Sequence, residues 1–172
     1  MIVKSYLAEK DSGLFNNNLI LFYGENLGLK EDFKKKISKH FSQDSVIKKN
    51  QEDLLNNEND FYVDLFNISL FEKKKIFIIS QCNDKIINLI DKIEGKLEDQ
   101  KIFLFAELLD KKSKLRNTFE KSKKNSCIAC YADNELTLKN IIISKLNGYS
   151  GLNSKNLNII IEHCNYDRSK LN

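Results

Sequence analysis

Two cysteines three positions apart are the first residues of this sequence whose types and spacing could do chemistry. Cys127 and Cys130 form a CxxC pair, a spacing used in redox centres and in zinc sites. Redox use needs a helix N-terminus that lowers the thiol pKa, but the short, apolar stretch 126–131 indicates a buried strand. A zinc site needs four convergent ligands, and the sequence offers no second pair of suitable spacing, since His163 and Cys164 are neighbours. We expect buried, reduced and metal-free thiols on opposite faces of a strand.

A second candidate for chemistry is the glycine-containing turn that follows the apolar run Leu19–Tyr23. A strand that leads through such a turn into a helix can bind nucleotide phosphates, because free backbone N–H groups and the helix dipole point at the anion. The turn from Gly24 to Lys30 lacks the GK[ST] ending of a phosphate loop, so it offers no lysine for the β- and γ-phosphates and no hydroxyl for magnesium. Glu25 would repel a triphosphate, and Gly24 and Gly28 alone do not make a GxGxxG motif. We expect this chain neither to bind nor to hydrolyse ATP, and to need no cofactor.

Basic residues are concentrated in one later stretch, and no catalytic constellation is legible elsewhere in the chain. The run consists of Lys111, Lys112, Lys114, Arg116, Lys121, Lys123 and Lys124. Such a run fits contacts with DNA phosphates or with a neighbouring protein, and it fits a solvated helix face equally well. The net charge of +4, from 28 Lys and Arg against 24 Asp and Glu, permits contact with DNA without demanding it.

The elements that must position these residues alternate between apolar strands and amphipathic helices. Hydrophobic residues make up 41% and charged residues 30% of the 172 residues, a globular composition. Continuous apolar runs are typical of strands covered on both faces, so we expect an α/β fold with a parallel sheet flanked by helices. Strands are expected at 19–23, 46–47, 76–79, 102–105 and around Cys127, and helices at 26–41, 53–66, 86–93, 113–121, 136–146 and 153–161. The 53–66 helix is expected to break near Asn56-Asn57.

The pattern changes after Asp133, where the chain becomes entirely helical. We expect an α/β domain over residues 1–134 and the beginning of a small helical domain over 135–172. We expect the second part to be too short to build its own core, which indicates either a fragment of a longer protein or a small domain that relies on another partner. No apolar run reaches the roughly 18 residues of a membrane span and the start lacks a signal peptide, so we expect a cytoplasmic protein without membrane contact.

Three segments, in a fixed order, carry a resemblance to a known family. They are the strand 19–23 with Gly24-Glu25-Asn26, then Ser69-Leu70-Phe71 before a basic run and an apolar strand, and Leu109-Asp110-Lys111-Lys112-Ser113-Lys114-Leu115-Arg116 after the strand 102–105. Their order and spacing resemble the delta subunit of bacterial DNA polymerase III, part of the sliding-clamp loader. The resemblance covers essentially the whole chain but only about the first half of the family's length.

The resemblance implies an AAA+-like, phosphate-loop-type first domain without a working phosphate loop, the start of a helical lid, and no collar domain. It implies a pseudo-ATPase that binds the sliding clamp (beta subunit) and opens the ring for loading onto primed DNA. Leu70 and Phe71 would enter a pocket of the clamp, with Ile68 and Ser69 beside them. Lys111, Lys112, Lys114 and Arg116 would contact DNA or a neighbouring subunit. The implied partners are the clamp, the other loader subunits and primer-template DNA, within a DNA-directed DNA polymerase (nucleotidyltransferase) holoenzyme.

Two rival functions stay open on the sequence alone. A small nucleotide-using enzyme would show tight ATP binding that depends on Gly24 or Lys30. A separate DNA-binding module would show a salt-sensitive affinity for DNA that a clamp does not change. The ordinary structural alternative for Leu70 and Phe71 is a loop that folds back onto the core.

Overall fold

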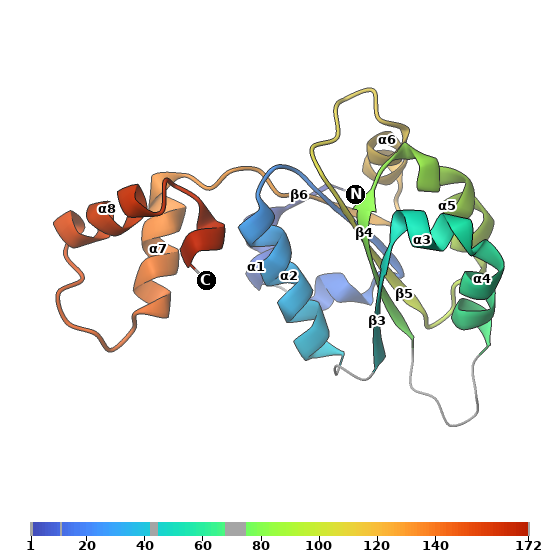
Figure 1. The fold of residues 1–172 in the computed structure, drawn as a ribbon, viewed down its shortest axis with the longest axis horizontal. Helices are drawn as coiled ribbons and strands as arrows, with labels where there is room; N and C mark the ends of the chain where they lie inside the picture. Colours follow the sequence, from blue (N-terminus) through green and yellow to red (C-terminus); the bar gives the residue numbers. More distant parts are fainter. Residues whose placement is uncertain (1, 11, 42–44, 68–74, 172) are drawn as a thin grey trace.

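The structure is a computed structural model that describes residues 2–10, 12–41, 45–67 and 75–171. Its centre is a six-stranded sheet in which every pairing is parallel, with the strand order β1-β6-β2-β5-β4-β3 (Figure 1). The strands are β1 (Ile2–Lys4), β2 (Leu19–Tyr23), β3 (Val46–Asn50), β4 (Ile76–Cys82), β5 (Lys101–Ala106) and β6 (Ser126–Ala129).

The apolar run of β2 is buried on both faces of the sheet because each face has its own hydrophobic core. Leu19, Leu21 and Tyr23 belong to one core cluster, while Ile20 and Phe22 belong to the other. Alternate side chains of a strand point to opposite faces, so a continuous apolar run needs cover on both sides. The predicted class, α/β with a parallel sheet flanked by helices, is confirmed.

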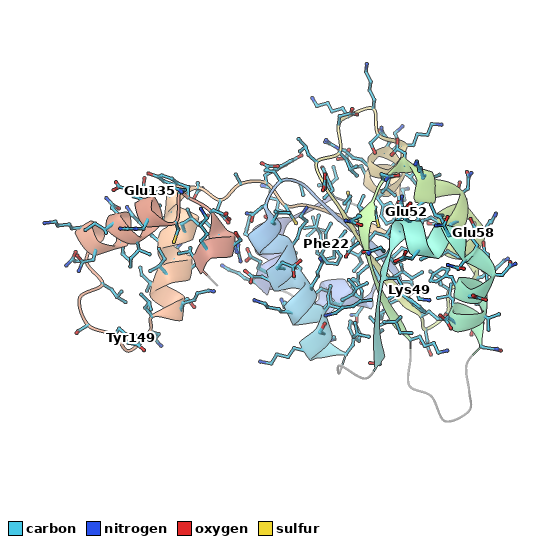
Figure 2. All side chains as sticks on the ribbon, in the orientation of Figure 1. Phe22, Lys49, Glu52, Glu58, Glu135 and Tyr149 are labelled. Atoms are coloured by element: carbon cyan, nitrogen blue, oxygen red, sulfur yellow. The ribbon has the colours of Figure 1, made fainter. Side chains whose placement is uncertain are left out.

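Two sets of helices provide that cover (Figure 1). One face is covered by α1 (Ser5–Lys10) and α2 (Leu27–His40), and the other by α3 (Gln51–Asn56), α4 (Glu58–Phe66), α5 (Ile87–Ile93) and α6 (Lys114–Lys121). Phe22 lies between the sheet and α2 (Figure 2), where its ring stacks on Phe105 with a centroid distance of 4.7 Å. Short 3-10 turns connect several elements: η1 (Ser12–Asn16), η3 (Asp84–Ile86) and η4 (Glu94–Lys96).

A smaller helical part follows the sheet and has its own small apolar centre, so the expectation that it is too short for a core of its own was wrong. It consists of α7 (Glu135–Lys145), α8 (Ser154–His163) and the 3-10 turn η5 (Arg168–Leu171). Leu138 and Ile142 of α7 pack with Leu157 and Ile161 of α8. Figure 1 shows this part beyond α1 and α2, joined to β6 by an extended stretch. None of the helices in the described ranges is long and apolar enough to cross a membrane.

The first strand and helix, β1 and α1, were not expected from the sequence, because a three-residue strand with two exposed side chains carries no periodic signal. The break expected near Asn56-Asn57 is confirmed, because the 53–66 stretch is divided into α3 and α4 at Asn57, whose φ of −129° is not helical. The expected cap of α2 is confirmed, since the Asn26 side chain accepts a hydrogen bond from the N–H of Leu29 at 2.9 Å.

Candidate functional site at the edges of the sheet

The turn between β2 and α2 lies at the carboxyl end of the sheet, between the ends of β5 and β6. Its backbone is bonded to both neighbours: the N–H of Gly24 donates to Glu107 O at 3.1 Å, and the N–H of Asn26 donates to Cys130 O at 3.0 Å. The Glu25 carboxylate accepts from the N–H of Ala132 at 3.0 Å. Donors that would face a phosphate in a phosphate loop are used here to hold the turn against the neighbouring strands.

Position 24 requires a glycine because the backbone at Cys130 lies directly against it. Its φ is +133°, and a Cβ at this position would lie 2.2 Å from the carbonyl oxygen of Cys130. No residue with a side chain fits that approach. The glycine therefore has a structural cause within the protein, and a bound phosphate is not needed to explain it.

Lys30 corrects one of the sequence expectations. Counted from Gly24, it stands at the lysine position of GxxxxGK[ST], with Leu29 in place of the second glycine and Glu31 in place of the hydroxyl residue. The expectation that the sequence has no lysine at the phosphate-binding position of the motif was therefore wrong, because Lys30 occupies that position. A direct count of the motif from Gly24 would have found this lysine.

The environment of Lys30 is that of an internal cation. Its Nζ donates to Gly24 O at 2.8 Å and to Ala106 O at 2.9 Å, and the residue is only 6% exposed. Burial lowers the pKa of this ammonium. The side chain thus ties the start of α2 to the ends of β2 and β5.

A small cavity of about 120 Å³ lies beside Lys30, between the start of α2 and the ends of β4 and β5. Ser80 and Gln81 line it where β4 ends, and Gln81 has a left-handed φ of 58° at an irregularity of the β4–β5 pairing. Phosphate-loop enzymes hold magnesium with the loop hydroxyl and an Asp, whereas Glu31 and Glu107 are the carboxylates lining this cavity. Among the described residues, no group of three or more His, Cys, Asp and Glu could hold a metal ion.

The connection from β5 to α6 is held by hydrogen bonds to the Asp84 carboxylate. The Asp84 carboxylate accepts from the hydroxyl of Ser113 at 2.7 Å and from the N–H groups of Lys114 and Leu115 at 3.0 Å each. The Ser113 hydroxyl bond, followed by the Leu115 N–H bond, lowers the pKa of Asp84. Ser113 also caps α6 by accepting from the N–H of Arg116 at 3.2 Å.

The four basic residues predicted to meet DNA or a subunit fall into two groups. Lys111, Lys112 and Lys114 are exposed. Arg116 is turned inward: its Nε donates to Glu120 at 2.8 Å, its Nη1 donates to Leu109 O at 3.0 Å, and its guanidinium lies over the Tyr23 ring. The structure therefore leaves the three lysines available to a partner and uses the arginine within the domain.

The residues predicted to bind a clamp, Ile68, Ser69, Leu70 and Phe71, lie outside the described residues. The positions on either side of this segment are held together, since Lys75 Nζ donates to Asn67 O at 3.0 Å. The N–H of Lys101 donates to Lys75 O at 3.3 Å and attaches the start of β4 to β5. Because β2 and β4 are parallel members of one sheet, the start of β4 lies at the edge opposite the Gly24 turn.

The two cysteines of the CxxC pair are fully buried, and each contributes to a different core cluster. The prediction of buried thiols on opposite faces is confirmed, although Cys130 lies just beyond the end of β6. Burial raises the pKa of Cys127 and of Cys130 to about 12.

Comparison with known proteins gives a result at the level of the fold. No family model matches the chain, and no curated protein matches it in sequence. Among solved structures, the Bacillus subtilis DNA clamp loader delta protein (YqeN) matches with a TM-score of 0.62 and 12% identity, over 96% of this chain and 55% of that one. A chain from a structure of katanin self-assembly matches with a TM-score of 0.42 and 19% identity, over 84% of this chain and 51% of that one, and carries no further argument.

The chain spans about half the length of the clamp loader delta protein that it matches. At 12% identity the likeness shows the fold alone. The fold is an α/β parallel sheet with a following helical part, and it is similar to the fold of that clamp loader delta protein.

Proposed function

We propose that this chain is a delta-like subunit of a sliding-clamp loader that acts in DNA replication in the cytoplasm. The observation that carries the proposal is the fold likeness to a clamp loader delta protein over 96% of the chain. Its partners in this proposal are the sliding clamp, the other loader subunits and primer-template DNA. Its task is to bind the clamp and favour the opened ring.

The geometry of the Gly24 turn supports a binding role without nucleotide chemistry. The Lys30 ammonium is already bonded to two carbonyl oxygens, and Glu31 stands where a hydroxyl would reach magnesium. A triphosphate would have to displace Lys30 from both carbonyls while meeting the carboxylate of Glu25. We propose that the chain is a pseudo-ATPase in which the phosphate loop has become a structural joint.

The clamp-binding element in this proposal is the segment Ile68, Ser69, Leu70 and Phe71. The bonded pair Asn67 and Lys75 keeps its two ends together at the edge of the sheet opposite the Gly24 turn. Burying a leucine and a phenylalanine is worth roughly 1.5–3 kcal/mol each, or about 3–6 kcal/mol together before ordering costs. The clamp would open if this contact is stronger on an opened ring, because a partner shifts an equilibrium only through its differential affinity for the two states.

The exposed lysines of the β5–α6 connection support a second contact. Lys111, Lys112 and Lys114 extend from a backbone fixed by Asp84 and Asp110, so a phosphate or an acidic surface would meet a preformed basic face. We assign the proposed contact with DNA or a neighbouring subunit to these three lysines. Arg116 contributes to this contact only indirectly, because its bonds to Glu120 and Leu109 O stabilise the position of α6.

The test is the binding of this chain to the sliding clamp of the same organism. The double variant Leu70→Ala, Phe71→Ala should lower clamp affinity by about two or more decades, at 1.4 kcal/mol per tenfold. Its free energy of unfolding in urea should change little. A matched control is Leu136→Ala, Tyr149→Ala, which removes a leucine and an aromatic ring that are 68% and 73% exposed on the helical part (Figure 2).

The control pair should leave both clamp affinity and stability unchanged. A large stability loss in the Leu70, Phe71 variant would show that the pair packs in the core. A clamp affinity that is the same with and without the double substitution would contradict the proposed function. The absence of clamp binding by the unmodified chain would also contradict it.

A further inference from the structure

One buried arginine joins the helical part to the sheet domain. Arg168 of η5 is 6% exposed, and its guanidinium bonds three carboxylates: Asp32 through Nε at 2.9 Å, Asp133 through Nη1 at 3.4 Å, and Glu9 through Nη2. These partners come from α2, from the stretch after β6 and from α1. A single cation therefore contacts three separate segments of the chain.

The backbone around Arg168 lies against α2 without space for a methyl group. A Cβ on Gly28 would lie 2.5 Å from the N atom of Ser169 and 2.8 Å from the carbonyl carbon of Arg168. Figure 1 shows η5 between α7 and the pair α1 and α2. Like Gly24, Gly28 is required because another backbone segment of this protein packs directly against it.

The chain enters η5 through a strained turn. Asn165 and Tyr166 have φ values of 51° and 56°, two consecutive left-handed residues that are not glycine. Such conformations persist only where surrounding contacts enforce them. The Asp167 side chain accepts from the N–H of Ser169 at 2.9 Å and so closes the turn that presents Arg168.

The position of this segment relates it to the Gly24 turn. Tyr166, Asp167 and Arg168 line a crevice of about 180 Å³ whose other wall includes Glu25 and Asn26. The segment 166–168 thus packs beside the turn where a phosphate loop would bind a nucleotide. At this position the helical part is joined to the sheet domain by protein carboxylates and a protein guanidinium.

We propose that residues 165–171 form an intramolecular latch, in which Arg168 between Glu9, Asp32 and Asp133 fixes the helical part on the sheet domain without any nucleotide. The latch is a conformational device: engaged, it makes the two parts one rigid unit, and released, it leaves α7 and α8 free to move about the stretch after β6. A guanidinium removed from this buried site leaves three carboxylates facing one another, so the engaged state depends on it. This inference does not rest on the proposed clamp binding.

The test measures the distance between the two parts by pulsed electron spin resonance. Spin labels are placed at Glu52→Cys on α3 and Asn158→Cys on α8, both exposed positions, in a Cys164→Ser background. The otherwise unmodified chain should give one narrow distance distribution that added Mg-ATP leaves unchanged. Arg168→Ala should broaden it, and Arg168→Lys, which loses the multiple hydrogen bonds of the guanidinium, should broaden it partly.

A second route to release keeps every charge in place. Gly28→Ala should broaden the distribution by displacing the Ser169 backbone, and it serves if Arg168→Ala fails to fold by circular dichroism. Lys139→Ala, which removes an ion pair within α7, is the control and should keep the distribution narrow. A narrow distribution in both Arg168→Ala and Gly28→Ala, or a distribution in the unmodified chain that narrows only with Mg-ATP, would overturn the proposal.

Discussion

Cationic side chains near the carboxyl edge of the sheet fall into two regions with opposite roles. Around the Gly24 turn, Lys30 and Arg168 are each 6% exposed and bonded to oxygens of the protein itself. On the β5–α6 connection, Lys111, Lys112 and Lys114 are exposed. The same charge is structural in the first region and available to a partner in the second, so the region that looks like a catalytic loop is the one with the least to offer a ligand.

The largest expected effect lies in the region around the Gly24 turn. Lys30→Met leaves Gly24 O and Ala106 O without their donor, and each unsatisfied buried carbonyl costs about 1–3 kcal/mol. We expect the free energy of unfolding to fall by about 2 kcal/mol or more. Urea unfolding followed by circular dichroism measures it, with Lys114→Met as the exposed control, expected within about 0.5 kcal/mol. Equal values for the two variants would remove the distinction between the regions.

The next largest effect is expected from the exposed lysines of the β5–α6 connection. The triple variant Lys111→Ala, Lys112→Ala, Lys114→Ala should weaken binding to primed DNA about tenfold or more, and the slope of log affinity against log salt should fall by up to about 3. Stability should hold, since the backbone bonds to Asp84 and Asp110 remain. The matched control replaces three exposed lysines elsewhere, Lys35→Ala, Lys39→Ala and Lys155→Ala. The same loss in both triples would mean that net charge alone governs the affinity.

A smaller effect is expected at the cap of α6, within the β5–α6 connection. Ser113→Ala should lower the free energy of unfolding by about 1 kcal/mol, as other N-cap losses do.

The pKa of Asp84 is lowered in the folded protein. The contribution of its carboxylate to the stability of the fold is therefore present above the unfolded pKa of about 4, and it is lost as the pH falls through the folded pKa. The stability gap between the unmodified chain and Asp84→Asn should therefore narrow from pH 7 to pH 3 in urea unfolding. A gap that stays constant would show that the Asp84 charge has no part in the cap.

The smallest effect on function is expected from the buried cysteines. Cys127→Ala, Cys130→Ala should leave clamp affinity unchanged, because both thiols lie inside the core. With pKa values of about 12 and full burial, they should resist a thiol reagent at pH 8 until the protein unfolds. Stoichiometric zinc in the purified protein, or rapid labelling of either thiol, would contradict this.

The fold could be predicted from the sequence wherever a strand is buried on both faces. The runs Leu19–Tyr23 and 102–105 are uninterrupted because two cores need them, and that pattern is visible without a structure. β1 was missed because its three residues are exposed in alternation at the edge of the sheet and are too few to show a period. Asn57, which divides α3 from α4, was suspected because the neighbouring asparagines weaken a helix.

The site could be predicted only in part, because roles depended on contacts between distant residues. Lys30 occupies a motif position that counting alone reveals, but its bonds to Gly24 O and Ala106 O depend on how β2 and β5 pair. Arg116 looked equivalent to Lys114 in the sequence, and only the fold places Glu120 and Tyr23 beside it. Arg168 gave no sequence signal, since its three carboxylates are 136, 35 and 159 positions away.

The proposed function has two parts: this chain binds a clamp, and its phosphate loop no longer binds nucleotide. Two calorimetric titrations of one protein sample test both parts, one with Mg-ATP and one with the sliding clamp of the same organism. We expect saturable heat with the clamp and none with Mg-ATP. Saturable micromolar binding of Mg-ATP that is lost in Lys30→Met, with no heat from the clamp, would contradict the proposed function.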